Sequence, residues 1–205
     1  MAQDLANGTL VDPFGGQGDL KALRLRMVFA RAFDEDPLRI LRGIQFAARF
    51  GLSVEAETLA AMKRCAPLLS TVSAERVANE LGKLLMAPRP SIGFYLMKEI
   101  GATQIVLPEL HELIGVPQPS KKEVGDAFDH TMRVVDAARS DEALEHAGNL
   151  TLMLAALFHD VGKARTKRFN DEKGRIVFHG HQFVSKRMSK KRLAALKINT
   201  LGLDP

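Results

Sequence analysis

Apolar residues recur at three- and four-residue spacing from about residue 21 to residue 112, with helix breakers between the runs. This spacing is typical of helices that bury one face against a shared core. The expected successive short helices cover residues 56–65, 73–86 and 90–100. Ser73 is the expected cap of the second helix, and Gly101 is the expected stop of the third. The pattern predicts an all-α fold that starts with a helical bundle.

A further helix start is marked by Asp36 followed by Pro37. The aspartate carboxylate can accept hydrogen bonds from unpaired N–H groups of the first turn, and proline loses nothing at a position whose N–H has no partner. Steps of about 100° per residue from this start separate a polar stripe from an apolar face. The stripe carries Arg39, Arg42, Phe46 and Arg49, and the opposite face carries Leu38, Ile40, Leu41, Ile44, Ala47 and Ala48.

This stripe allows two interpretations. It is a solvated face whose arginines make local ion pairs, or it is a binding surface. The spacing of the charged residues favours binding. Glu35 and Asp36 are followed, after two further residues, by Arg39, which sets a carboxylate and a guanidinium one turn apart at a helix N-terminus. Such an edge of acceptors and donors can pair with the hydrogen-bonding edge of a nucleobase.

A second apolar pattern predicts a separate helical unit with a polar centre. Residues 150–158 are almost wholly apolar and end in His159 and Asp160, whereas residues 128–136 begin an amphipathic helix that bears His130. A lone histidine is usually structural, but two ionisable groups at the end of a buried helix need partners. A divalent metal satisfies both at once, and His130 on a neighbouring antiparallel helix could supply a third ligand. We therefore expect a metal site formed by these three side chains.

Two basic stretches flank this unit. Residues 116–123 contain two prolines and a lysine pair, which is typical of a loop or domain boundary. Residues 182–197 predict an amphipathic helix with a strongly basic outer face. That face fits RNA phosphates and equally fits solvent.

Composition narrows the class of protein only in part. With 205 residues, of which 46% are hydrophobic, the chain is long enough for one large or two small cores. A net charge of +5 fits a partner with phosphates but is too small to decide. Cys65 is the single cysteine, which excludes an internal disulfide and indicates a reducing cytoplasm. Neither secretion nor membrane insertion is supported, since the longest uncharged apolar stretch, residues 149–158, is shorter than the roughly 20 residues of a span.

Three segments carry recognisable motifs: Asp-Pro-Phe-Gly-Gly-Gln-Gly-Asp-Leu over residues 12–20, Glu-Asp-Pro-Leu-Arg-Ile-Leu-Arg over 35–42 and Arg-Phe-Gly over 49–51. Together they resemble the bacterial tRNA nucleotidyltransferase (CCA-adding) and poly(A) polymerase family. The resemblance implies that Asp36 and Arg39 pair with the base of the incoming nucleotide and that Glu35 supports them. Arg42 completes the implied nucleotide-binding set.

The same resemblance implies an RNA-binding role for the region that follows. The implied RNA-binding residues are Arg49, Lys63 and Arg64, with Arg76 and Lys83 as further candidates for phosphate contacts. Each of these cations, taken alone, also fits an ordinary surface charge. The implied substrates are ATP, CTP and a tRNA or other RNA 3′ end, with Mg²⁺ as cofactor.

The resemblance places the polymerising carboxylates outside this chain. In the family they lie in a mixed β head, and residues 1–20 correspond to the end of that head and a hinge. Residues 34–36 read Asp-Glu-Asp, but they open a helix and lack the strand and glycine-rich turn that hold a two-metal centre. We therefore identify no residue of this chain as catalytic for nucleotidyl transfer.

The second unit resembles the HD superfamily of metal-dependent phosphohydrolases. The matching residues are His130, His159-Asp160, Gly162-Lys163 and Phe178-His179-Gly180-His181. The resemblance implies a metal that lowers the pKa of bound water for attack on a phosphoester, with Lys163 available to the phosphate. His179 and His181 are further candidates for metal or phosphate contact, or belong to a polar turn. The superfamily's last ligand is an aspartate on a later helix, and after Asp171 only Asp204 remains, so we expect an incomplete C-terminus.

The expected organisation is a head end and hinge over residues 1–20, a helical neck and body over 21–115 and a helical HD-type domain over 124–205. Our leading hypothesis is a fragment of a cytoplasmic nucleotidyltransferase of this family. Two alternatives stay open: a self-standing metal phosphohydrolase in which the first half is scaffold, and a non-catalytic RNA-binding module. Addition of CCA, of part of CCA or of poly(A) fits the sequence equally, and the oligomeric state has no sequence signal.

Overall fold

The computed structural model describes residues 2–3, 5–118, 124–140, 149–172 and 174–198. Its α-helices are α1 (Gly16–Lys21), α2 (Ala32–Glu35), α3 (Leu38–Phe50), α4 (Ala56–Cys65), α5 (Ala74–Leu85), α6 (Pro90–Glu99), α7 (Thr103–Val106), α8 (Pro108–His111), α9 (Ala127–Ser140), α10 (Leu150–Phe158), α11 (Lys163–Thr166) and α12 (His181–Ala195). A 3₁₀ helix, η1, spans Ala66–Thr71. The strands are β1 (Ala2–Gln3), β2 (Leu10–Val11), β3 (Arg24–Leu25), β4 (Ser53–Val54), β5 (Arg168–Asn170) and β6 (Arg175–Val177).

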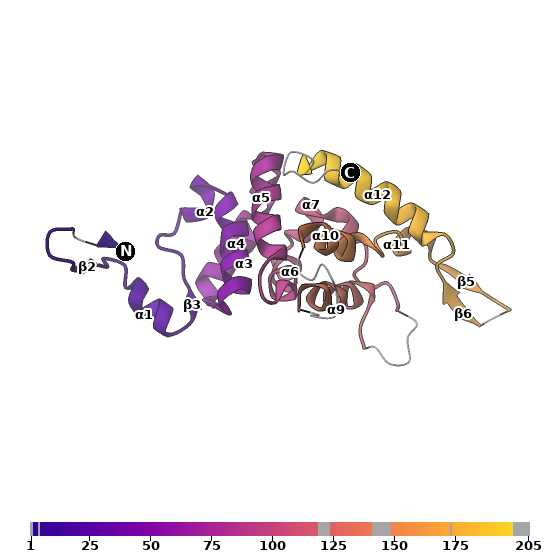
Figure 1. Ribbon diagram of the computed structural model, residues 1–205, viewed down its shortest axis with the longest axis horizontal. Coiled ribbons are helices and arrows are strands. Elements are labelled where there is room, and N and C mark those ends of the chain that lie inside the picture. The colour runs from indigo at the N-terminus through magenta and orange to yellow at the C-terminus, as the bar shows by residue number, and fades with distance from the viewer. Residues whose placement is uncertain (1, 4, 119–123, 141–148, 173, 199–205) are drawn as a thin grey trace.

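The described part of the chain is elongated, and the predicted all-α class is confirmed (Figure 1). The antiparallel pair β1–β2 and α1 lie at one end, and the helices α2 to α10 form the middle. At the other end, α12 runs along the outside and the antiparallel pair β5–β6 projects from the body. No described helix is long and apolar enough to cross a membrane.

Most helices lie where the apolar spacing predicts them. The predicted helix over 56–65 coincides with α4. α5 is one residue shorter than predicted at each end, and α6 is one residue shorter at its C-terminal end. Ser73 occupies the cap position of α5 with extended backbone, although its side chain makes no capping hydrogen bond. Gly101 follows α6 with a φ of 76°, a left-handed conformation that suits glycine at a helix end.

The expectation of helices throughout residues 21–112 is wrong for the segment after α1. Leu23, Leu25 and Met27 alternate with two arginines, which is the period of a strand. The segment forms β3, which pairs in parallel with β4 after α3. Backbone N–H groups of Ser53 and Glu55 donate to the carbonyls of Leu23 and Leu25 at 2.8 and 3.0 Å. The strand pairing supplies hydrogen bonds that a short, arginine-rich helix would leave to water.

The helix α3 lies at the centre of the first half and packs against α5 and α6 (Figure 1). Its predicted apolar face is confirmed, since these side chains are all buried: Leu38, Ile40, Leu41, Ile44, Ala47 and Ala48. Gly93 allows α6 to approach closely, because a Cβ atom there would lie 3.1 Å from Cγ2 of Ile44. The buried face fixes which way the opposite, cationic stripe of α3 points.

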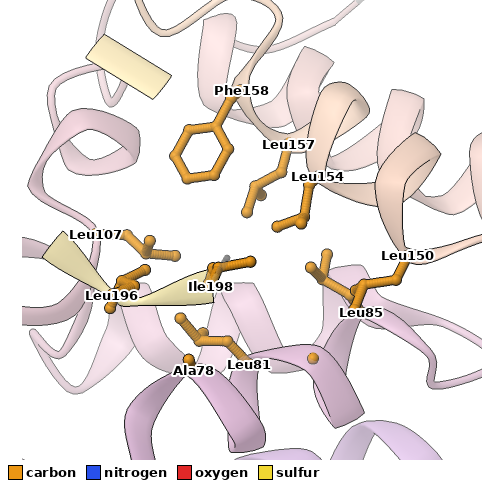
Figure 2. A pocket seen from close by; sticks show the side chains of 11 residues that line it. Ala78, Leu81, Leu85, Leu107, Leu150, Leu154, Leu157, Phe158, Leu196 and Ile198 are labelled. Carbon is orange, nitrogen blue, oxygen red and sulfur yellow. The ribbon is translucent and has the colours of Figure 1, made fainter. Parts of the chain in front are cut away.

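One apolar core continues from the first half of the chain into the second. Figure 2 shows its junction, where side chains of α5, α10 and the segment after α12 converge. Leu81 and Leu85 come from α5, Leu157 comes from α10, and Leu196 and Ile198 close the other side. The predicted boundary at 116–123 lies in part, at 119–123, outside the described residues, as does Asp204.

Candidate functional site

The first candidate site is the N-terminal mouth of α3. The helix begins at Leu38, one residue later than predicted, with Pro37 already in helical conformation. Pro37 thus takes the cap position predicted for Asp36, but Oδ1 of Asp36 accepts a hydrogen bond from the Leu38 N–H at 3.2 Å. Asp36 itself has extended backbone between α2 and α3, and its side chain is partly exposed.

Asp36 and Arg39 bond to other partners and not to each other. Nη2 of Arg76 donates to both oxygens of Asp36, at 3.2 and 3.0 Å. Arg39 donates to the carbonyl of Ala32 at 3.0 Å and lies 3.6 Å from Glu35. The side chains of Asp36 and Arg39 are 26% and 39% exposed, so both are accessible to a ligand.

Arg39 and Arg42 line a cavity of about 320 Å³ between α3 and the segment that contains β3. Apolar and aromatic side chains form much of its wall. The lining residues are Leu25, Arg26, Met27, Val28, Phe29, Ala32, Phe33, Arg39, Arg42, Gly43, Phe46, Thr58 and Met62. The Arg39 guanidinium lies over the Phe29 ring, 5.6 Å from its centroid, a cation–π arrangement that restrains it at the cavity edge. Apolar spacing could not place Phe29 at this cavity, because Phe29 follows β3 and meets α3 only in the folded chain.

The predicted RNA-binding cations lie on two surfaces. Arg49 is exposed at the end of α3 and borders a shallow groove of about 480 Å³ together with Asn79 and Lys83 of α5. Lys63 and Arg64 are exposed in the last turn of α4 and do not line that groove. Arg64 also lies 3.7 Å from Asp34. These residues therefore form no single patch.

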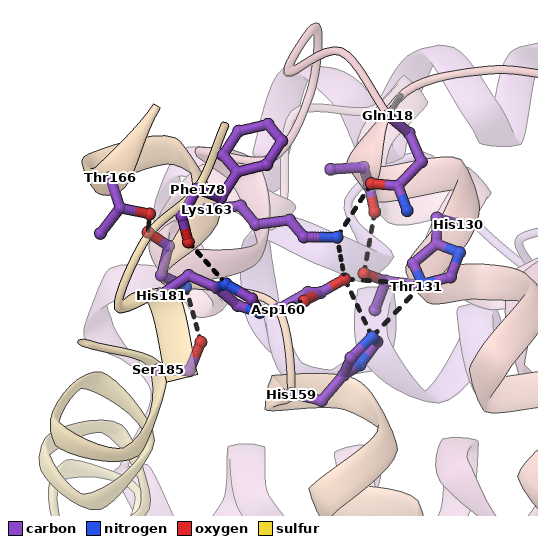
Figure 3. Close-up of polar contacts among 12 residues, drawn as sticks. Gln118, His130, Thr131, His159, Asp160, Lys163, Thr166, Phe178, His181 and Ser185 are labelled. Atoms are coloured by element: carbon purple, nitrogen blue, oxygen red, sulfur yellow. Dashed lines mark hydrogen bonds and ion pairs between the residues drawn. The ribbon is translucent and has the colours of Figure 1, made fainter. Parts of the chain in front are cut away.

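The second candidate site brings together side chains that lie far apart in the sequence (Figure 3). His130 lies in the first turns of α9, and His159 and Asp160 follow directly after α10. Nε2 of His159 lies 3.4 Å from Nε2 of His130 and 3.0 Å from Oδ2 of Asp160. The ligand atoms of these three residues all lie within 4.8 Å of one another. Because α10 is largely buried, the His159 and Asp160 side chains that follow it lie close to His130.

Backbone contacts select the ring nitrogens that face the centre. Nδ1 of His159 lies 2.7 Å from the carbonyl of Ala156, and Nδ1 of His181 lies 2.8 Å from the carbonyl of Phe178. An Nδ1–H that donates to a carbonyl leaves Nε2 with a lone pair for a metal. Nε2 of His181 lies 3.3 Å from Oδ1 of Asp160, so His181 joins the cluster. His179 is exposed and lies outside the ligand group formed by the described residues.

Lys163 enters the same centre from the first turn of α11. Its Nζ donates to Oδ2 of Asp160 at 2.6 Å and to Oε1 of Gln118 at 2.9 Å, and its side chain is buried (Figure 3). Gln118 was missed because it lies in a proline-rich stretch that resembles a plain loop. Ser185 was missed as well, and its Oγ accepts from the N–H of Gly162 at 2.9 Å.

The charges of the cluster compensate one another. Burial raises the pKa of Asp160, but hydrogen bonds from His159 and Lys163 outweigh burial and hold this pKa well below its usual range. Burial lowers the pKa of His159, but its hydrogen bonds with Asp160 and the Ala156 carbonyl raise it overall. Two imidazole nitrogens and one carboxylate oxygen, with a third imidazole beside them, are a donor set that fits a divalent transition metal.

Two family models match separate parts of this chain. Residues 51–114 match the probable RNA and SrmB-binding site of polymerase A, and residues 127–201 match the HD domain. The helices and the His/Asp cluster thus define a class of protein in which a helical RNA-binding region is followed by an HD domain.

Known relatives narrow this class. The chain is 47% identical over 167 residues to the multifunctional CCA protein of Chromobacterium violaceum, and this match covers 80% of the chain and 39% of that relative. It is 42% identical over 198 residues to the multifunctional CCA protein of Dechloromonas aromatica, with coverage of 94% and 45%. The chain thus spans about two fifths of the length of these curated relatives. Over that part it is similar to the multifunctional CCA proteins, in agreement with the resemblance found in its sequence.

Solved structures agree on the fold. The structure of a CCA-adding enzyme in apo form II matches with a TM-score of 0.59 and 22% identity, and the match covers 96% of this chain and 44% of that one. This likeness supports the helical architecture of the described residues.

Proposed function

We propose that this chain is the nucleotide-selecting, RNA-binding and HD portion of an enzyme that adds nucleotides, CCA in the first place, to tRNA 3′ ends. Its substrates are CTP, ATP and tRNA, and Mg²⁺ serves the carboxylates of a head domain outside the chain. The enzyme works in the cytoplasm. In this proposal residues 1–20 form the end of the head and the hinge, 21–115 the neck and body, and 124–205 the HD domain.

The arrangement at the mouth of α3 carries this proposal. Asp36 offers carboxylate acceptors, and Arg39 offers guanidinium donors beside a cavity with aromatic walls. A carboxylate accepts from the amino group of cytosine or adenine, whereas uracil and guanine present a carbonyl at that position. This chemistry accounts for a choice of CTP and ATP over UTP and GTP. Glu35 restrains Arg39, and Arg42 adds a second cation at the cavity.

Exposed cations on two surfaces are the candidates for contacts with RNA phosphates. Arg49, Lys63 and Arg64 are all exposed, and Arg49 shares a groove with Lys83. Lysine and arginine contacts with phosphates release counterions, so tRNA binding by this chain should weaken steeply as salt is raised. Binding that does not change with salt would contradict phosphate contacts.

The test of nucleotide selection is Arg39→Ala in the full-length enzyme that carries this chain. We expect the ratio of kcat/KM for CTP over UTP to fall by about one to two orders of magnitude, because one good base contact contributes about 1–3 kcal/mol. Arg24→Ala is the matched control, since Arg24 is an exposed arginine whose partner, Asp19, lies outside the cavity. Unchanged selectivity in Arg39→Ala removes the proposal.

The cluster around Asp160 supports a second activity, metal-dependent phosphoester hydrolysis. His130, His159 and Asp160 would hold a divalent metal, which when bound supplies an acidified water for attack on a phosphoester. Lys163 donates a hydrogen bond to Asp160 and orients this carboxylate, and its ammonium group would attract a substrate phosphate. The carbonyls of Ala156 and Phe178 fix the rings of His159 and His181.

Metal analysis of the purified chain tests this second activity. We expect one divalent ion per chain after incubation with Mn²⁺, Co²⁺, Ni²⁺ or Zn²⁺, and a rise in melting temperature on binding. His159→Ala should lose both effects. His111→Ala, which removes an exposed histidine of α8, should keep them. Absence of a bound ion in the unchanged chain would exclude the metal site.

A further inference from the structure

Arg76 lies in the first turn of α5 and reaches the mouth of α3, forty residues earlier in the sequence. Its Nη2 donates to Oδ1 and Oδ2 of Asp36 at 3.2 and 3.0 Å. The Arg76 side chain is half-exposed, so this contact is not a requirement of the core. This surface contact joins α5 to Asp36, the carboxylate that we propose to pair with the base. Its position therefore suggests a role in function.

Asp36 has enough acceptor sites to bond to Arg76 and to a base at the same time. A carboxylate has about four lone-pair sites, two on each oxygen. The Leu38 N–H and Arg76 both donate to Oδ1, whereas Oδ2 accepts from Arg76. The two donors fix both torsions of the Asp36 side chain and leave acceptor capacity on Oδ2 for the amino group of a base.

The backbone that carries Arg76 is itself fixed against α3. Val77 and Leu81 of α5 are buried and belong to the same core as Ile44 and Ala48 of α3. The backbone at Arg76 is thus held at a set distance from the mouth of α3 by packing on the other side of both helices. Positioning groups need such support, because a carboxylate that is misplaced by a fraction of an ångström loses its hydrogen bond to the base.

We infer that Arg76 is a positioning residue that sets the orientation of Asp36 and thereby the preference for bases with an amino group over bases with a carbonyl. This inference rests on the proposed function. Arg76 acts through Asp36 and does not touch the nucleotide. The role differs from the phosphate contact expected from the sequence, which would affect all four nucleotides equally.

The experiment compares Arg76→Gln, Arg76→Lys and the unchanged protein in the full-length enzyme that carries this chain. The readout is kcat/KM for CTP, UTP, ATP and GTP on the same tRNA. In Arg76→Gln we expect the CTP-over-UTP and ATP-over-GTP ratios to fall roughly tenfold, within the range of one base contact. Arg76→Lys should restore part of the ratio, because lysine keeps the cation but loses the planar geometry of the guanidinium.

The matched control is Glu75→Gln, which removes an exposed ion pair with Lys197 from the same turn of α5. It should leave both ratios unchanged. All three variants should melt within about 2 °C of the unchanged protein, since exposed ion pairs contribute little to stability. A melting temperature that falls further in Arg76→Gln, with unchanged ratios, would assign Arg76 a structural role and overturn the inference.

Arg39→Ala, assayed in parallel, separates failure of this inference from failure of the proposed function. Relaxed selectivity in Arg39→Ala together with unchanged ratios in Arg76→Gln overturns the role of Arg76 alone. Unchanged ratios in both variants overturn both. An equal loss of kcat/KM for all four nucleotides in Arg76→Gln, with weaker tRNA binding, would assign Arg76 to an RNA phosphate and also overturn the inference.

Discussion

At the scale of single residues, the effect of a polar contact is clearest where the hydrogen-bond partner is identified, as it is for Tyr95. Tyr95 of α6 is the one tyrosine of the chain, and its hydroxyl donates to Oδ1 of Asp129 at 3.1 Å. Burial, the charge of Asp129 and this hydrogen bond together raise the pKa of Tyr95 from 10 to about 12. All three favour the neutral phenol, so ionisation works against the folded state.

We therefore expect Tyr95 to titrate near 12, which absorbance of the phenolate at 295 nm can follow without interference from tryptophan. Because the folded pKa is raised above that of the unfolded chain, the stabilisation is fully present below pH 10 and is lost as the pH rises toward 12. Asp129→Asn should lower the midpoint, and it should lower it more than Asp136→Asn. A midpoint near 10 in the folded protein would contradict this contact.

Residue patterns predicted the polar centre only in part. His159 and Asp160 could be predicted because they end an apolar helix. His130 could be predicted because it lies on the amphipathic helix before that one. Gln118 and Arg76 could not be assigned, because their contacts span 45 and 40 residues and depend on how separate helices pack. A sequence pattern reports the face on which a side chain lies, but not which distant residue meets it.

At the scale of elements, the approach of α12 to the turn after Asp160 decides the position of His181. A Cβ atom on Gly162 would lie 2.4 Å from the carbonyl oxygen of His181 and 2.7 Å from the backbone nitrogen of Ser185. Both are backbone atoms, so a side chain at residue 162 must push the first turn of α12 away. Glycine is thus required here for contact between two elements.

Gly162→Ala should therefore lower the free energy of unfolding by about 1–3 kcal/mol, as overpacking does, and should also weaken metal binding by moving His181. Urea denaturation and metal titration check the two effects. Gly82→Ala is the control, because its Cβ would meet Leu150 at an ordinary 4.0 Å and alanine favours a helix by up to about 1 kcal/mol. Equal behaviour of both variants would show that the close approach does not matter.

Helices that continue a periodic apolar pattern over many residues were predicted well, and strands of two or three residues were not. The ten residues of α4 carry enough apolar spacing to fix both ends. The two residues of β3 and the three-residue strands β5 and β6 do not, since their existence depends on a partner strand. Tertiary hydrogen bonds, and not local preference, form these strands.

For the whole molecule, the RNA-binding region and the HD domain share one core. Leu85 of α5 and Leu157 of α10 are both buried at the junction in Figure 2. Bidentate ion pairs add to this contact, with Arg192 on Glu109 at 2.8 and 3.0 Å and Arg165 on Glu112 at 2.8 and 2.7 Å. The predicted division at 116–123 therefore does not separate two independent cores.

Leu157→Ala should accordingly lower the free energy of unfolding by about 2–5 kcal/mol, the usual cost of a cavity in a core. Hydrogen exchange should show amides of α5 and α10 losing protection together. Leu68→Ala, at a partly exposed position of η1, should have a much smaller effect. Loss of protection confined to α10 would indicate that the two regions unfold separately.

The parallel pairing of β3 with β4 has a mechanical consequence for the cavity beside Arg39. Two backbone hydrogen bonds fasten Leu23 and Leu25 to the segment after α3, so one wall of the cavity travels with the helices that form the other. Leu23 has a φ of 48°, which turns the chain sharply just ahead of this fastening. We therefore expect a displacement of α1 and of the β1–β2 pair to leave the cavity unchanged, because both precede this corner.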